Sequence, residues 1–177
     1  MPADQTEYEL RLVEPGDTLT GLSLGDEAFQ PLKTFLQRDA KRFQGRNLGR
    51  TYGVFAGRKI VAYVTLVCGE VSSCDDIRDA QDGFTYDSYP AIKIARLAVD
   101  RRHRGGLGLG RQLVEFSLGV AKNQICPAVG CRFVVVDSKQ QSIGFYERCG
   151  FTTINTVANR DRDQPVMFID LHRIPAA

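Results

Sequence analysis

A glycine-rich segment between a predicted strand and a predicted helix most constrains how this chain can fold. Four of the eight residues from Arg104 to Arg111 are glycine, and an arginine stands at each end. Glycines at the start of a helix let successive backbone N–H groups converge on one anion, and the helix dipole adds to the attraction. We therefore expect residues 104–111 to bind a phosphate or pyrophosphate. The alternative is a glycine-rich turn that only connects two elements.

The spacing of these glycines argues against two common phosphate-binding loops. The segment matches G-x-x-x-x-G, but Arg111 and Gln112 stand where a P-loop needs Lys and then Ser or Thr. Its last three glycines are spaced G-x-G-x-G rather than G-x-G-x-x-G, and it follows several predicted strands instead of opening the first β–α turn. Neither nucleotide hydrolysis nor hydride transfer is expected.

The hydrophobic periodicity predicts a mixed α/β fold. Strands are expected at residues 8–13, 51–55, 60–68, 91–99, 131–136, 151–154 and 166–171. Helices are expected at residues 29–43, with Asp26 as a cap, at 109–120, and at 138–149, with Ser138 as the cap and Gly150 as the stop. Residues 71–90 show no period and are expected to form a mobile flap. An antiparallel front half joined to a β-α-β back half gives a mostly antiparallel sheet flanked by helices.

The strand expected at residues 91–99 changes its inward face along its length. Ile92 and Ile94 occupy even positions, whereas Leu97 and Val99 occupy odd ones. Because side chains alternate along a strand, this switch predicts an extra residue near positions 95–96, a β-bulge in a central strand. The alternative is a strand buried on both faces.

Length and composition favour one domain over residues 1–177. The chain is 43% hydrophobic and 25% charged, which suits a single compact core. It contains no apolar run near the roughly 20 residues of a membrane-spanning helix and no signal-peptide pattern at its start, so we expect a cytoplasmic protein without membrane contact. The five cysteines include no C-x-x-C pair, which favours reduced thiols, and no Cys/His spacing indicates a metal site.

Three motifs resemble those of the GNAT superfamily of acetyltransferases, in the expected order and separation. They are L-A-V-D at residues 97–100, the glycine-rich segment, and F-Y-E-R-C-G-F at residues 145–151. The superfamily loop is usually written R/Q-x-x-G-x-G/A. Here Gly105 fills the Arg or Gln position and Arg104 stands one place earlier, so the loop is one residue longer. The resemblance implies the GNAT fold, acetyl-CoA as donor, and donor-binding residues Leu97, Ala98, Val99, Arg104, Gly105, Gly106, Leu107, Gly108, Leu109, Gly110 and Arg111.

Within that superfamily the chain is most similar to the GNAT-type toxins of bacterial toxin–antitoxin systems, which acetylate the α-amine of aminoacyl-tRNA. The similarity extends over roughly residues 25–155 and is carried by residues 35–52, 63–71 and 89–100. It departs at Lys139, where many superfamily members carry Asn or Asp. The resemblance implies tRNA and a small DNA-binding antitoxin as partners, and it leaves a homodimer open.

Tyr146 and Glu70 are the expected catalytic residues. The resemblance implies direct attack of the amine on the thioester, with Tyr146 protonating the departing thiolate; the alternative is a core tyrosine. Glu70, at the end of its strand, could act as a base through water or be an ordinary surface carboxylate. An α-amine is about 10% neutral at pH 7, against about 0.04% for a lysine, so an α-amine acceptor needs less help from a base.

The charge pattern leaves the acceptor open. The local net charge is +4 over residues 38–50, +5 over 93–111 and −5 over 70–87. Basic segments suit a phosphate backbone such as tRNA, whereas the acidic one suits a polyamine, antibiotic or peptide amine, and all three could simply be solvated faces. A CoA-binding regulator without catalysis is a further alternative. The side chains expected to contact the acceptor are Arg38, Arg42, Arg46, Lys93 and Arg96.

Overall fold

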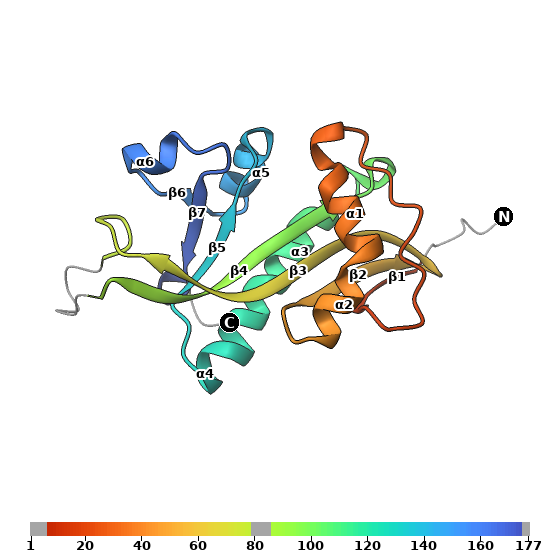
Figure 1. The fold of residues 1–177 in the computed structure, drawn as a ribbon, viewed down its shortest axis with the longest axis horizontal. Coiled ribbons are helices and arrows are strands. Elements are labelled where there is room, and N and C mark those ends of the chain that lie inside the picture. The colour runs from red at the N-terminus through yellow and green to blue at the C-terminus, as the bar shows by residue number, and fades with distance from the viewer. Residues whose placement is uncertain (1–6, 79–85, 175–177) are drawn as a thin grey trace. The chain divides into compact units, whose positions relative to one another are not determined.

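The computed structural model of the chain describes residues 7–78 and 86–174 (Figure 1). Seven strands form a sheet in the order β1-β2-β3-β4-β5-β7-β6. Pairing is antiparallel for β1–β2, β2–β3, β5–β7 and β6–β7 and parallel for β4–β5, which confirms the predicted mixed, mostly antiparallel sheet. The strands are β1 (Tyr8–Leu12), β2 (Arg50–Ala56), β3 (Lys59–Ser72), β4 (Ser88–Val99), β5 (Phe133–Asp137), β6 (Thr152–Thr153) and β7 (Val166–Asp170).

Each of the three expected helical stretches contains helix: the one at 109–120 has the predicted bounds, and the other two are broken or shorter. The helices are α1 (Gln30–Arg38), α2 (Ala40–Gly45), α3 (Leu109–Val120), α4 (Cys126–Ala128), α5 (Ile143–Arg148) and α6 (Val157–Arg160). The two short helices α4 and α6 were not predicted. A π-helical turn follows α3 at Ala121–Ile125, and 3-10 turns lie at Glu27–Phe29, Arg101–His103, Gln140–Ser142 and Leu171–Arg173. Within the described ranges, no helix has the length and apolar character needed to span a bilayer.

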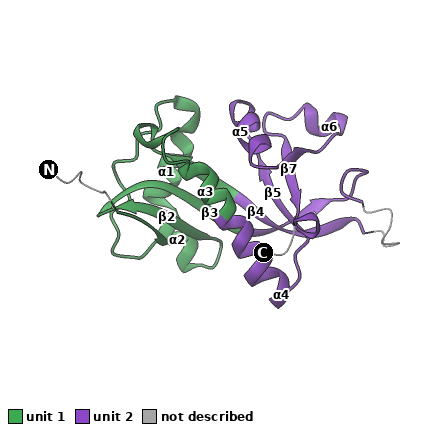
Figure 2. Cartoon of the chain, turned by 180° about the vertical axis from the view of Figure 1, so that it is seen from behind, with its two compact units in different colours: residues 1–67, 95–115 green, residues 68–94, 116–177 purple. Residues whose placement is uncertain are grey.

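The chain divides into two compact units, each built from two separate segments (Figure 2). Unit 1 comprises residues 1–67 and 95–115, and unit 2 comprises residues 68–94 and 116–177. Strands β3 and β4 each contribute to both units. The single domain over residues 1–177 stays a prediction.

In unit 1, the helix expected at residues 29–43 forms as two helices. The Asp26 carboxylate accepts a hydrogen bond from the Ala28 N–H, so Asp26 caps the 3-10 turn that leads into α1, whereas α1 itself has no side-chain cap. The apolar stripe is buried as expected, with Phe35 and Leu36 among the core residues. The helix breaks at Asp39, which ends α1 and immediately precedes α2.

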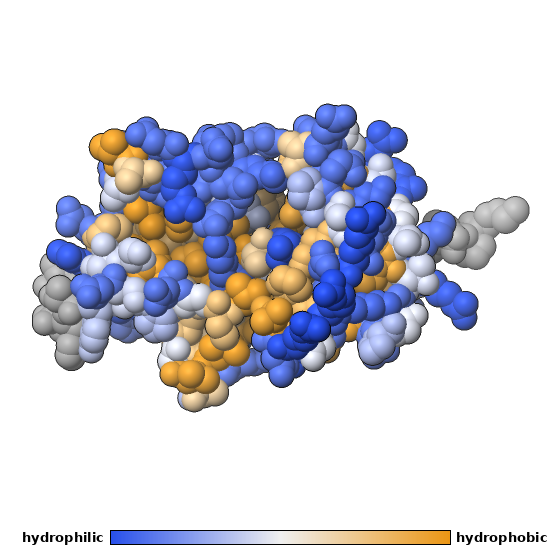
Figure 3. Space-filling view, in the orientation of Figure 1, coloured by the Kyte–Doolittle hydropathy of each residue, from blue (hydrophilic) through white to orange (hydrophobic). Residues whose placement is uncertain are grey.

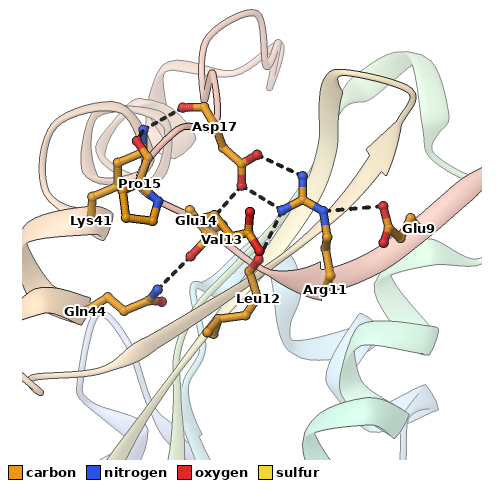
Figure 4. Close-up of polar contacts among 9 residues, drawn as sticks. All are labelled: Glu9, Arg11, Leu12, Val13, Glu14, Pro15, Asp17, Lys41 and Gln44. Atoms are coloured by element: carbon orange, nitrogen blue, oxygen red, sulfur yellow. Dashed lines mark hydrogen bonds and ion pairs between the residues drawn. The ribbon is translucent and has the colours of Figure 1, made fainter.

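A polar network fixes α2 to the end of β1 and the loop that follows (Figure 4). Arg11 donates two hydrogen bonds to the Asp17 carboxylate at 2.7 and 2.8 Å, and this pairing lowers the pKa of that carboxyl. Lys41 donates from Nζ to the Asp17 carbonyl at 2.5 Å, and Gln44 donates from Nε2 to the Val13 carbonyl at 2.6 Å. Two of the side chains of α2 are therefore committed to holding the helix in place.

The burial pattern of β4 differs from the predicted parity switch. Ala91 and Ile92 are both buried, and beyond them only the even positions Ile94 and Ala98 are buried, at 1% and 5% exposed, whereas Leu97 and Val99 are half-buried. The burial pattern therefore does not support the bulge expected near residues 95–96, which stays a prediction. A register irregularity is found instead in the β2–β3 pair.

In unit 2, the connection from strand β5 to helix α5 differs from the predicted one. Ser138 was expected to cap the helix, but its hydroxyl donates to the Lys139 carbonyl, and a 3-10 turn separates it from α5. The predicted stop is confirmed, because Gly150 has a left-handed φ of 95° just after α5. Of the flap expected at residues 71–90, both ends belong to β3 and β4, and residues 79–85 lie outside the described residues.

Candidate functional site

The glycine-rich loop of unit 1 leads directly into α3. Gly105 and Gly108 have φ values of 88° and 61°, in the left-handed region that favours glycine. An added Cβ at Gly105, Gly106 or Gly108 would meet no protein atom within 4 Å, so open space adjoins the loop. The loop is therefore shaped for a group other than its own protein neighbours.

The backbone N–H groups of this loop are available to a ligand. The ladder of α3 begins with the Gln112 N–H, which donates to the Gly108 carbonyl at 3.0 Å. Over the described part of the chain, the N–H groups from Gly105 to Gly110 have no protein acceptor. Free amides at the N-terminus of a twelve-residue helix, together with its dipole, are groups that can bind an anion.

Arg104 anchors the loop rather than extending toward a phosphate. Its guanidinium donates to the Val99 carbonyl at 3.1 Å and to the Leu24 carbonyl at 2.9 Å. Arg111, at the other end, pairs with Glu115 at 3.2 Å and is largely exposed. Both arginines were expected to contact the donor, but each side chain already has a partner within the protein.

Asp100 is a second anchor of the loop, and its role was not assigned from the sequence. Its buried carboxylate accepts from the Ser23 N–H at 2.8 Å and from the Arg102 guanidinium at 2.7 and 2.8 Å. The hydrogen bonds from Arg102 hold the pKa of Asp100 well below its usual range. An aspartate directly after a predicted strand and before a glycine-rich turn was the available signal.

The other expected donor-binding residues lie at the end of β4. Ala98 packs into the core of unit 1, and Leu97 and Val99 are half-buried. The Val99 carbonyl already accepts from Arg104. The end of β4 and the glycine-rich loop are thus joined by a side chain as well as by the short connection between them.

The predicted acceptor-binding arginines of unit 1 differ in their availability. Arg38, Arg42 and Arg46 are exposed along α1 and α2, where Figure 3 shows a run of strongly hydrophilic side chains. Arg42 lies 3.5 Å from the Asp39 carboxylate. Arg96 instead stacks on the Phe35 ring, 3.6 Å from its centroid, so its guanidinium covers the core under α1.

A cavity of about 510 Å³ in unit 2 brings together two further predicted residues. Glu70 and Lys93 both line it. Lys93 pairs with the Asp137 carboxylate at 2.5 Å, and Glu70 accepts from the Ser88 hydroxyl at 2.9 Å. Lys93 is therefore neutralised locally rather than presented to a phosphate backbone.

Tyr146 is buried in α5 of unit 2. Its ring lies edge-on to those of Phe145 and Phe151, with centroids 5.0 and 5.4 Å apart, and burial raises its pKa above the ordinary value. Over the described residues, the His103 Nδ1 atom is the only fully enclosed side-chain nitrogen or oxygen without a hydrogen-bond partner, and it lies 3.8 Å from the Asp100 carboxylate. As a whole residue, Tyr146 is 6% exposed.

A protein-family model decides the family. The model for the acetyltransferase (GNAT) family matches residues 22–151. The chain belongs to the acetyltransferase (GNAT) family. It is therefore an acyl-CoA-dependent N-acyltransferase, a class that uses acetyl-CoA. No curated protein matches the chain.

Solved structures support the same fold. A tyrosine-to-phenylalanine mutant of KacT is 23% identical with a TM-score of 0.78, covering 93% of this chain and 95% of that one. AtaT complexed with acetyl-methionyl-tRNAfMet is 20% identical with a TM-score of 0.78, covering 94% and 96%. AtaTR bound with AcCoA is 22% identical with a TM-score of 0.75, covering 93% and 94%.

Proposed function

We propose that this protein transfers an acetyl group from acetyl-CoA to the α-amine of an aminoacyl-tRNA. The observation that carries the proposal is the open glycine-rich loop, whose free N–H groups from Gly105 to Gly110 fit the pyrophosphate of the donor. Backbone groups of Leu97, Ala98 and Val99 would hold the pantetheine arm. Arg104 and Asp100 hold the loop in place, which supports this assignment. A loop that is already ordered loses little conformational entropy when it binds its ligand.

The chemistry follows from two groups of unit 2. A neutral α-amine attacks the thioester carbonyl, the C–N bond forms, and the C–S bond breaks as the thiolate leaves. Tyr146 donates its proton to that thiolate, and its raised pKa keeps the hydroxyl protonated until then. Glu70 accepts the proton lost by the amine through water, and both residues return to their starting states by exchange with solvent.

An RNA-linked acceptor is supported by the surface of α1 and α2. Arg38, Arg42 and Arg46 are exposed there, and the network around Lys41 holds α2 in place. Exposed guanidinium groups are suited to phosphate oxygens. Among proteins of similar fold, AtaT is seen with acetyl-methionyl-tRNAfMet. KacTA is seen with DNA, and AtaT with the C-terminus of the antitoxin AtaR, which supports a DNA-binding antitoxin partner for this chain as well.

A direct assay tests the acceptor. The protein is incubated with labelled acetyl-CoA and either aminoacylated or uncharged tRNA, and the ester bond is then hydrolysed under mild base. We expect label only with aminoacylated tRNA, released as an N-acetyl amino acid. Label appearing only on polyamines or protein lysines, with harmless expression in bacteria, would contradict the proposal.

A further inference from the structure

The cavity of unit 2 has an aliphatic floor and a charged rim. Val71, Val135 and Ile154 belong to the buried apolar cluster of this unit, and all three line the cavity with Val166. Among the residues that the structure describes, none that lines the cavity is aromatic. Its volume of about 510 Å³ lies in the usual range of small-molecule sites. The floor can therefore take an aliphatic group while the rim contacts polar atoms.

The charges at the rim balance one another. Glu70 and Asp137 are acidic, and Lys93 and Arg162 are basic. Lys93 and Asp137 already pair at 2.5 Å. Burying a further unpaired charge beside a satisfied ion pair is costly, whereas an uncharged group can be buried against the floor without this penalty. The lining thus favours an uncharged occupant.

The cavity includes one of the two residues that we assign to the chemistry, and one of its walls leads along the chain to the other. Glu70 lines it directly. Asp137 is the last residue of β5, and the chain then passes through one 3-10 turn into α5, which carries Tyr146. In both Figure 1 and Figure 2, α5 and α6 lie over the same part of unit 2, beside β5 and β7. An acceptor bound in this cavity would therefore lie beside Glu70.

We propose that this cavity holds the aminoacyl group of the acceptor and selects uncharged aliphatic side chains over charged ones. This inference rests on the proposed aminoacyl-tRNA acetylation. The amino acid, and not only the tRNA, then determines which acceptors are used. Asp137 is a specificity residue, because it cancels the charge of Lys93.

Two substitutions of neighbouring residues separate this role from general damage. Ala158 lines the cavity but is exposed, so Ala158→Phe fills the cavity without opening the core. Val157 is 66% exposed and does not line the cavity, so Val157→Phe is the matched control. The assay compares kcat/KM for valyl-, methionyl-, glycyl-, lysyl- and aspartyl-tRNA, with thermal unfolding of each variant as the check on folding.

The expected pattern has three parts. Wild-type protein should prefer valyl- or methionyl-tRNA over lysyl- and aspartyl-tRNA by at least about tenfold. Ala158→Phe should lower kcat/KM for the aliphatic acceptors by about tenfold or more, while glycyl-tRNA, which lacks a side chain, changes less than about threefold. Val157→Phe should behave like wild type on every acceptor.

A third variant yields a gain rather than a loss. Asp137→Asn removes the partner of Lys93 and leaves a net positive charge in the cavity, so aspartyl-tRNA should improve by about threefold or more relative to valyl-tRNA. Three results would each overturn the inference while leaving aminoacyl-tRNA acetylation intact. The first is equal use of charged and aliphatic acceptors by wild-type protein. The others are an unchanged ratio of aspartyl- to valyl-tRNA activity in Asp137→Asn, and a loss on glycyl-tRNA in Ala158→Phe that equals the loss on aliphatic acceptors. No acetylation of any aminoacyl-tRNA by wild-type protein would overturn both.

Discussion

Tyr146 is a buried residue packed against two aromatic rings, and its proposed role can be tested by removing the hydroxyl alone. Tyr146→Phe removes one oxygen and leaves the ring contacts with Phe145 and Phe151 in place. We expect unchanged acetyl-CoA affinity and thermal stability, and a fall in turnover of roughly 100-fold, the usual scale for losing a general acid. Single-turnover acetylation and calorimetric donor titration measure the two quantities.

The pH dependence provides the control for this substitution. The pKa of Tyr146 in the folded protein lies above the unfolded value of about 10, so the folded protein keeps this proton as pH rises. The stability gained from burying the neutral hydroxyl is lost only when the pH rises through the folded pKa. Wild-type turnover should therefore show no falling limb from this group between about pH 7 and pH 9. If Tyr146→Phe turns over at the wild-type rate, the role of Tyr146 is purely structural.

The destinations of individual cations could not be predicted from the sequence. Arg104, Arg96 and Lys93 were all expected to meet ligands, yet the first donates to two backbone carbonyls, the second stacks on Phe35, and the third pairs with Asp137. Lys and Arg have long, flexible side chains that reach across neighbouring elements. Which carbonyl, ring or carboxylate they reach is set by the tertiary structure, which periodicity does not encode.

Among the elements, the loop before α3 was predictable because its signal is local. Four glycines fix both the turn and the approach to an anion, and the structure places φ values of 88° and 61° at Gly105 and Gly108. The break at Asp39 was not predictable, because the apolar stripe continues unchanged through it. An apolar stripe shows which face of a helix is buried, but it does not show whether the segment is one continuous helix or two.

Replacing Gly108 by valine tests the loop as a donor site. The substitution strains a left-handed residue and places a branched side chain in the open space beside the amides. We expect the acetyl-CoA dissociation constant to rise more than about tenfold, or about 1.4 kcal/mol. Gly130→Val is the matched control, because Gly130 also has a left-handed φ, of 89°, and open space, but lies outside the loop. Equal affinity in the two folded variants would place the donor elsewhere.

At the scale of the whole molecule, the order of strands and helices followed from the sequence, but the cavity did not. Its walls come from β3, β4 and β5 and from the segment between residues 154 and 166, which are widely separated along the chain. The apolar and charged wall residues were visible as such in the sequence, and Glu70 and Lys93 were both chosen for other reasons. Their shared cavity depends on strand order and register, which long-range pairing decides.

The distribution of charge over the molecule gives the last prediction. The whole chain carries only +2, so any attraction for tRNA must come from local surfaces such as the exposed arginines of α1 and α2. Three phosphate contacts there should raise the KM for aminoacyl-tRNA roughly 20- to 40-fold between about 50 and 200 mM salt, because released counterions lose their advantage. An amino-acid amide, which carries an α-amine without RNA, should show almost no change.

Charge reversal assigns that salt dependence to a surface. Arg46→Glu should raise the KM for aminoacyl-tRNA by about tenfold with little change in kcat, and it should flatten the salt dependence. Arg58→Glu makes the same charge change at an exposed position of the β2–β3 turn and should behave like wild type. If both variants respond alike, or if the amide and the tRNA share one salt dependence, α1 and α2 do not bind the RNA, and the acceptor is recognised through its amine alone.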